Sequence, residues 1–328
     1  MPCDGFILIT VKSAEVIKIK GKGSKKHGGR YYKSQNWQLY SMVAIPLLLI
    51  FVFAYLPMGG LVMAFQNFRF DTGFRSEWVG LENFRIFTRS NDFIRATWNT
   101  VSLNAIFIIT KTVFAVLVAI LLYQLRSAKT LKIYQTVFIT PHFLSWVLVA
   151  FIAYGFLEPR LGLLNSVLAR FGVQGPNWYA TPGAWPVILT IANIWKSFGM
   201  DCVIYYAALV GIDNTLVEAA KIDGAGWGKL VRYIYLPHLT ILITILTILS
   251  IGGIFRADMG LFYQLTLNSP RLFATTDVLD TLILRTMRVS RNFSISAAIG
   301  LLQSVLSFVL VLLTNFIVKK IDKDLGLF

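Results

Sequence analysis

The chain has 328 residues, of which 56% are hydrophobic and only 14% charged, and its mean hydropathy is +0.65. Soluble domains contain about 45–50% apolar residues, so this composition excludes an ordinary water-soluble protein. The net charge of +15 would suit nucleic acid, but the lysines gather at the ends and in particular connections, and we expect no nucleic-acid partner. With only two cysteines, Cys3 and Cys202, we expect neither a disulfide framework nor a thiolate metal site.

Residues 1–38 form a polar, basic segment that we predict to be a cytoplasmic tail near anionic lipid. The early apolar run from Phe6 to Val11 is too short for the core of a signal peptide, so we expect the tail to be retained. The piece GKGSKKHGG at 21–29 lacks the spacing of a phosphate-binding loop. The sequence therefore predicts no nucleotide site there.

Six apolar segments follow, each long enough to cross the roughly 30 Å hydrocarbon core of a bilayer. They predict an all-α polytopic membrane protein with six transmembrane helices over residues 39–320 and a cytoplasmic C-terminal end at 321–328. Pro46, Pro57 and Pro141 fall inside these segments, so several spans should be kinked or broken. The predicted spans are about 39–65, 98–125, 133–157, 185–209, 239–255 and 295–318.

The distribution of lysine and arginine predicts the orientation. Every lysine outside the apolar segments lies in the N-terminal tail, in the connections after the second and fourth spans, or at the C-terminal end, while the opposite loops carry arginine alone. Basic residues are enriched on the cytoplasmic side, so both termini should be cytoplasmic. The arginines of the outer loops could contact an acidic binding protein or an anionic saccharide, or could be ordinary solvated charge.

The stretch EAAKIDGAGWGKLVRYIYLP at 218–237 interrupts the apolar pattern inside a predicted cytoplasmic loop, 210–238. Asp213 is predicted to cap a short helix over 214–222 that ends at Gly224. A second helix is predicted over 227–235. It should end before Pro237, because a proline disfavours helical geometry in the residue before it.

This loop resembles the signature loop of the membrane subunits of binding-protein-dependent ABC importers. The family pattern is E-A-A, three residues, G, nine residues, I, one residue and L-P, often with the sequence DGA at the glycine. WVGLENF at 78–84 and IWKSFG at 194–199 extend the similarity to the carbohydrate branch, over about residues 38–320. The matching positions of the loop are Glu218, Ala219, Ala220, Asp223, Gly224, Ala225, Ile234, Leu236 and Pro237.

The resemblance is to the first membrane subunit of maltose-type importers and, more closely, to six-span permeases for oligosaccharides and polysaccharides such as alginate. It implies a type I ABC importer transmembrane domain whose loop helix couples to a cytoplasmic ATPase. The implied partners are a second homologous membrane subunit, two ABC ATPase subunits, an extracytoplasmic binding protein and a saccharide. Many relatives carry Asp-Pro where this chain has Asp213–Asn214, and the long tail is not covered.

The chain has neither a Walker A loop nor an ABC signature, so we expect no catalytic site and no cofactor. His27, His142 and His238 lack metal-ligand spacing, and no metal site is predicted. A secondary transporter and a membrane-embedded enzyme are the alternatives from other classes. The first leaves the E-A-A loop unexplained, and the second would need acidic or histidine residues clustered at one depth.

Three charged residues inside the apolar segments, Lys111, Lys196 and Asp201, are candidates for the translocation path. Ionised groups within a bilayer are costly and usually face the bundle interior or a water-filled route. The alternative is a structural ion pair. Lys196 and Asp201 are not expected to pair with each other, because their spacing puts them on different faces of one helix.

Overall fold

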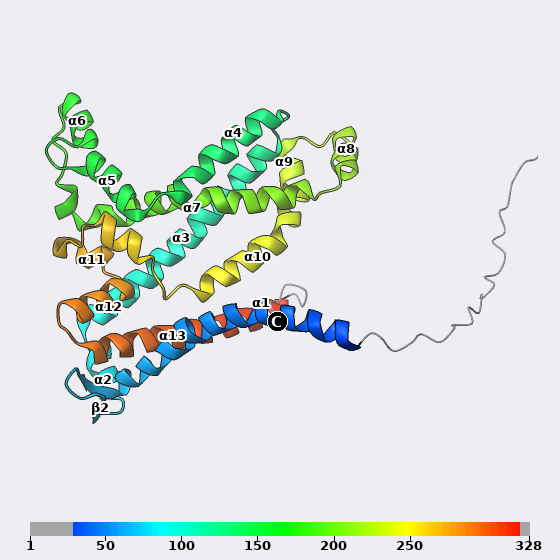
Figure 1. Ribbon diagram of the computed structural model, residues 1–328. Helices are drawn as coiled ribbons and strands as arrows, with labels where there is room; N and C mark the ends of the chain where they lie inside the picture. The colour runs from blue at the N-terminus through cyan, green and yellow to red at the C-terminus, as the bar shows by residue number, and fades with distance from the viewer. Residues whose placement is uncertain (1–28, 322–328) are drawn as a thin grey trace, which may run out of the picture. The chain divides into compact units, whose positions relative to one another are not determined.

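The computed structural model describes residues 29–321 (Figure 1). The chain divides into two compact units, one ending at Gly59 and the other beginning at Gly60. Residues 1–28 of the predicted tail and residues 322–328 of the predicted C-terminal end lie outside the described residues. The all-α prediction is confirmed, apart from one two-stranded hairpin in the second unit.

The first unit is built on helix α1 (Gly29–Ile50), which continues as the π-helical turn η1 (Phe51–Tyr55). The helix begins at Gly29 rather than at 39, so the last part of the predicted tail is helical. The candidate span Leu39–Phe65 is strongly apolar, and its most apolar stretch is not buried in the structure. So apolar a helix needs lipid or another apolar surface around it.

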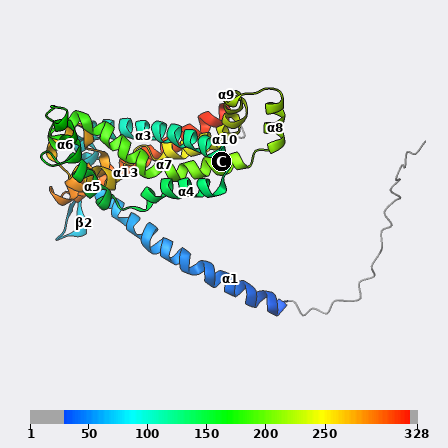
Figure 2. The ribbon, with the colours of Figure 1, turned by 90° about the horizontal axis from the view of Figure 1, so that it is seen from above.

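The second unit is a bundle of long helices. The 3-10 segment η2 (Leu56–Phe65) leads into it. In Figures 1 and 2, α3 (Asn91–Tyr123) and α7 (Trp185–Val210) run side by side, and α10 (Leu236–Gly252) and α13 (Phe293–Ile321) belong to the same bundle. The shorter helices are α2 (Glu82–Thr88), α4 (Ala128–Ile139), α5 (Trp146–Leu157), α6 (Leu163–Arg170), α8 (Asn214–Ile222), α9 (Trp227–Leu230), α11 (Phe273–Thr276) and α12 (Leu279–Arg288).

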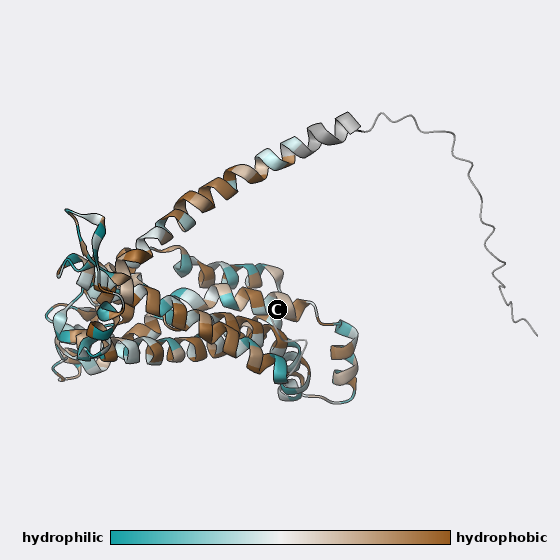
Figure 3. Cartoon of the chain, turned by 90° about the horizontal axis from the view of Figure 1, so that it is seen from below, coloured by the Kyte–Doolittle hydropathy of each residue, from teal (hydrophilic) through white to brown (hydrophobic). Residues whose placement is uncertain are grey.

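A small hairpin at one end of this unit was not predicted. Strands β1 (Gln66–Arg69) and β2 (Gly73–Trp78) pair antiparallel, with Gln66 opposite Trp78. Gly73 has a φ of +55°, a conformation that glycine adopts without steric cost. Figure 3 shows hydrophilic residues at the hairpin and the loops and mainly hydrophobic residues along the helices, as a bilayer requires.

Helices of the structure overlap all six predicted spans, and the third of these spans is bent. Five helices are long and apolar enough to cross a membrane among the residues described, or six if the pair Ala128–Phe143 and Trp146–Leu157 forms one span. That pair is bent by 99°. Pro141 lies in the 3-10 turn η3 (Thr140–Phe143) before the bend, and Ser145 caps α5 through the N–H of Leu148. The break predicted from Pro141 is therefore confirmed.

The predicted end of helix 227–235 before Pro237 is wrong. Helical geometry continues from Trp227 to Gly252, and Leu236 has φ −64° and ψ −46°. The residues before the proline form the π-helical turn η6 (Val231–Tyr235), in which the N–H of Leu236 reaches back to the carbonyl of Val231. A wider turn gives the proline ring more room than a regular α-turn, so the helix passes through it.

Candidate functional site

The loop between the fourth and fifth spans lies at one end of the second unit. Figures 1 and 2 place α8 and α9 at the opposite end from strand β2 and helix α6. The connection after α3 and the last turn of α13 lie at the same end as α8. The connections predicted for the two sides of the membrane are thus separated to opposite ends of the bundle.

Helix α8 begins and ends as predicted, at Asn214 and Ile222. The Asp213 side chain accepts the N–H of Thr215 at 2.9 Å, and hydrogen bonds from the Thr215 backbone and side chain lower the pKa of Asp213. At the other end the N–H of Ala225 donates to the carbonyl of Ala220 at 2.9 Å, and Gly224 has a φ of +78°. This hydrogen bond and the positive φ are typical of a left-handed helix terminus, which favours glycine.

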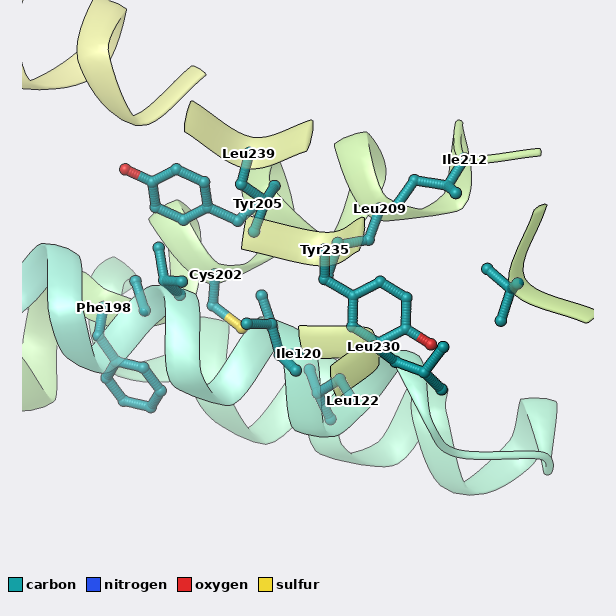
Figure 4. Packing of buried hydrophobic residues seen from close by; sticks show 14 residues of the cluster. Ile120, Leu122, Phe198, Cys202, Tyr205, Leu209, Ile212, Leu230, Tyr235 and Leu239 are labelled. Carbon is teal, nitrogen blue, oxygen red and sulfur yellow. The ribbon is translucent and has the colours of Figure 1, made fainter. Parts of the chain in front are cut away.

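The loop is held to the bundle by one buried cluster (Figure 4). Val217 anchors the middle of α8 in this cluster, and Ile212 and Leu230 anchor the segments on either side. Figure 4 shows Leu230 beside Leu122 of α3. Because these side chains are 4–6% exposed, a displacement of α8 would have to move the neighbouring ends of α3 and α7 or open their packing.

The other face of α8 is open to solvent. Leu216 is 55% exposed and Ile222 is 85% exposed, although both are large apolar residues. The structure sorts the predicted loop residues between the two faces. Glu218, Ala219, Asp223 and Gly224 are exposed, Ala220, Ala225 and Ile234 are partly buried against the cluster, and Leu236 and Pro237 begin α10.

Two of the three predicted path residues form an ion pair between α3 and α7. The Nζ of Lys111 lies 2.8 Å from Oδ2 of Asp201, and their side chains are 26% and 25% exposed. Asp201 therefore pairs with Lys111. It does not pair with Lys196, and this part was predicted from the helical spacing. The pair neutralises both charges inside an apolar bundle.

Lys196 occupies a different place, at the break in the third span. Its Nζ donates to the carbonyl oxygen of His142 at 2.8 Å and lies 5.2 Å from the ring centre of Trp146. The indole N–H of Trp146 in turn donates to Asp258 at 2.5 Å. Lys196 thus donates a hydrogen bond to a backbone carbonyl at the break and makes a cation–π contact with the Trp146 ring.

A polar pocket of about 220 Å³ lies between α3, α7 and the end of α10. Lys111 is the predicted path residue that lines it. The side-chain oxygen of Asn193 is buried and has no hydrogen-bond partner among the described residues. Besides Lys111 and Asn193, the residues that line the pocket include Asn104, Ser197, Ser250, Gly253, Ile254, Arg256 and Asp258.

Sequence reasoning missed most of these pocket residues. Asn193 and Ser197 are four positions apart on α7, and Asn104 and Lys111 are seven apart on α3. Residues at these spacings share one face of a helix, so a polar stripe within each apolar span was the available signal. Arg256 and Asp258 follow α10 in a segment without periodicity, and only the tertiary structure brings them to the pocket.

Replacing Lys111 with Met should destabilise the bundle by about 1–3 kcal/mol, because Asp201 is left without its cation in a mostly apolar setting. The double replacement Lys111→Met with Asp201→Leu should recover most of that loss. Thermal unfolding of the purified protein in detergent measures both, with the exposed Lys132→Met as the control. A double variant no more stable than the single one would contradict the pairing.

The comparisons with known proteins agree with this architecture. Residues 101–325 match the family described as binding-protein-dependent transport system inner membrane component. The polygalacturonan/rhamnogalacturonan transport system permease protein YteP of Bacillus subtilis (strain 168) is 32% identical, over 88% of this chain and 90% of that protein.

Two solved structures have the same fold. One is a bacterial ABC transporter involved in the import of the acidic polysaccharide alginate, with a TM-score of 0.81 and 30% identity over 89% of this chain and 99% of that one. The other is a bacterial alginate ABC transporter in complex with an alginate pentasaccharide-bound periplasmic protein, with a TM-score of 0.80 and 29% identity over 89% and 98%. This chain belongs to the family of binding-protein-dependent transport system inner membrane components.

Proposed function

We propose that the chain is a permease subunit of an ABC importer for saccharides, and that with a second homologous membrane subunit it forms an alternating-access path. The observation that carries this proposal is the short helix α8, anchored at one end of a bundle of apolar helices that also contains a polar pocket. The family consists of membrane components of transport systems, which argues against the secondary-transporter and enzyme alternatives.

The exposed face of α8 is the proposed contact with a cytoplasmic ATPase. Leu216, Ala219 and Ile222 recur every three residues and offer apolar surface, with the charge of Glu218 beside them. Two ATPase subunits would each seat one such helix, one from each membrane subunit, and would supply the ATP hydrolysis. Nucleotide shifts the transporter between its two states only by its differential affinity for them.

The polar pocket is the proposed part of the translocation path within this subunit. Lys111 contributes to its wall with its charge already balanced by Asp201, whereas Arg256 forms no ion pair with any residue that the structure describes. A guanidinium that forms no direct ion pair can bind the carboxylate of a uronate through two parallel hydrogen bonds. Lys196 acts on the path indirectly, through the break that it supports.

The saccharide is proposed to be acidic. Alginate and polygalacturonan are uronate polymers, and the names of two similar proteins mention them. In this chain, the positive charge of Arg256 in the pocket wall also favours an acidic saccharide.

We place both termini and α8 in the cytoplasm, because the lysine-bearing connections gather at the end of the bundle that carries α8. An extracytoplasmic binding protein would then deliver the saccharide at the other end, near the hairpin and α6. The similar transporter solved with a periplasmic protein supports this arrangement.

The test is ATP hydrolysis and uptake in proteoliposomes that contain this chain with its copurifying subunits and binding protein. Oligouronates are expected to stimulate both activities, and neutral oligosaccharides of equal length are expected to stimulate them less. An intact complex without saccharide-dependent ATP hydrolysis would contradict the importer function. Equal stimulation by both classes would contradict the acidic substrate alone.

Replacing Arg256 with Gln should lower oligouronate uptake by at least about tenfold, since a charge-assisted hydrogen bond to a carboxylate contributes about 1.5–3 kcal/mol. Uptake of a neutral oligosaccharide should change little. Arg170→Gln, at the end of α6 and outside the pocket, is the matched control. An equal loss for both saccharide classes would assign Arg256 a structural role.

A further inference from the structure

The fifth span ends beside the polar pocket. Helix α10 ends at Gly252, and the π-helical turn η7 (Gly260–Gln264) begins eight positions later. Residues 253–258, here called the pocket turn, are not helical. Four of them, Gly253, Ile254, Arg256 and Asp258, line the pocket. The end of a helix and a non-helical turn leave backbone groups that must find partners within the protein.

Side chains from other helices take up these freed groups. Asn104 of α3 donates to the carbonyls of Ile254 at 2.8 Å and Arg256 at 3.0 Å. Gln303 of α13 donates to the carbonyl of Phe255 at 2.5 Å. The N–H of Ala257 donates to Oδ2 of Asp280, at the start of α12, at 2.7 Å. The shape of the pocket turn is therefore set by three helices that pack around it.

Asp280 and Gln303 also bind each other. The amide N–H of Gln303 donates to Oδ2 of Asp280 at 3.1 Å, so one carboxylate oxygen receives donors from both the pocket turn and α13. Gln303 is 5% exposed and lies in a strongly apolar helix. Burial raises the pKa of Asp280, and the hydrogen bonds from Ala257 and Gln303 together with the nearby charge of Arg256 oppose that rise.

Neither residue lines the pocket. An apolar residue at 303 would favour membrane insertion, and an apolar residue at 280 would avoid the cost of burying a carboxylate. Their polar groups serve the backbone of the pocket turn, whose other side presents Arg256 to the pocket. The arrangement matches that of groups that orient a binding residue without touching the ligand.

We propose that Asp280 and Gln303 are positioning residues, which hold the pocket turn in the conformation that presents Arg256 to an acidic saccharide. This role rests on the proposed function. It makes the selectivity of the pocket for acidic saccharides depend on two residues outside the pocket. It also links α12 to the pocket wall, because Asp280 stands at the first turn of that helix.

The first measurement is made without transport. The substitution Arg256→Cys is made in a chain that also carries Cys3→Ser and Cys202→Ala, within the full complex. The rate at which this cysteine reacts with a charged, water-soluble maleimide is then measured. Asp280→Ala and Gln303→Leu should each speed labelling by at least about fivefold, because each leaves a backbone group of the turn without its partner. Asp280→Asn should stay within about twofold of the parent, since its amide oxygen can accept the same two donors.

The second measurement is uptake of an oligouronate and of a neutral oligosaccharide by the same variants with Arg256 restored. Asp280→Ala and Gln303→Leu should reduce the preference for the oligouronate by at least about fivefold, and Asp280→Asn should retain it. Ser304→Ala is the matched control, because the Ser304 hydroxyl donates to Gly300 within α13 and not to the turn.

The outcomes separate the two proposals. Unchanged labelling in both Asp280→Ala and Gln303→Leu would overturn the positioning role, as would faster labelling with an unchanged saccharide preference. A parent complex that takes up no saccharide would contradict the proposed function, while the labelling rates would still report whether Asp280 and Gln303 hold the turn. If Asp280→Ala does not accumulate, Gln303→Leu and Asp280→Asn decide the result.

Discussion

Gly224→Val is expected to reduce saccharide-stimulated ATP hydrolysis by at least about tenfold while the protein still inserts in the membrane. Gly224 has a φ of +78°, where an L-residue costs roughly 1–2 kcal/mol and a β-branched residue more. A steric clash is not the cause of the expected loss, since a Cβ added at Gly224 would meet no atom within 4 Å. Valine instead favours a backbone conformation with negative φ, so the turn between α8 and α9 is lost.

Gly228→Val is the matched control for this change. Gly228 lies four residues further on in α9, also has open space for a Cβ, and has no positive φ. It should keep stimulated hydrolysis within about twofold of the parent, since a helical position tolerates valine at a cost of under about 1 kcal/mol. Membrane insertion is checked by detergent extraction and size-exclusion chromatography. Normal stimulation in Gly224→Val would count against α8 as the coupling helix.

Gly199→Val is expected to prevent accumulation of the folded protein. A Cβ on Gly199 would overlap the carbonyl of Phe138, because α7 and α4 approach each other at backbone distance here. Overpacking usually costs about 1–3 kcal/mol when side chains can move, and two backbones cannot adjust as easily, so the cost should exceed that range. Small residues at such crossings are typical of helix packing in membranes.

The comparison is with Gly155→Val, in α5, where an added Cβ meets no atom within 4 Å. It should leave both yield and thermal unfolding temperature close to those of the parent. Fluorescence-detected size-exclusion chromatography after detergent extraction measures the folded fraction. A folded, monodisperse Gly199→Val protein would show that α4 and α7 can separate at this crossing without loss of the fold.

Local signals in the sequence predicted the parts of the fold that depend on few residues. Hydropathy located the spans, and Asp213 and Gly224 fixed the ends of α8 because a cap and a left-handed terminus are formed within one turn of chain. Pro141 marked a break but not its angle of 99°, nor the contacts that Lys196 makes there with His142 and Trp146. Pro237 was misleading, since the π-helical turn before it is not encoded by any simple residue preference.

The sequence alone thus determined the membrane class, the helical spans, the coupling-loop motif and the presence of charges inside the spans. The tertiary structure alone decided that Lys111 pairs with Asp201, that Lys196 supports the break in the third span, and that a polar pocket joins α3, α7 and the pocket turn. The physical reason is the range of the interactions. Hydropathy and helix ends depend on neighbours along the chain, whereas an ion pair or a pocket requires side chains from separate helices, whose relative rotation is set by packing.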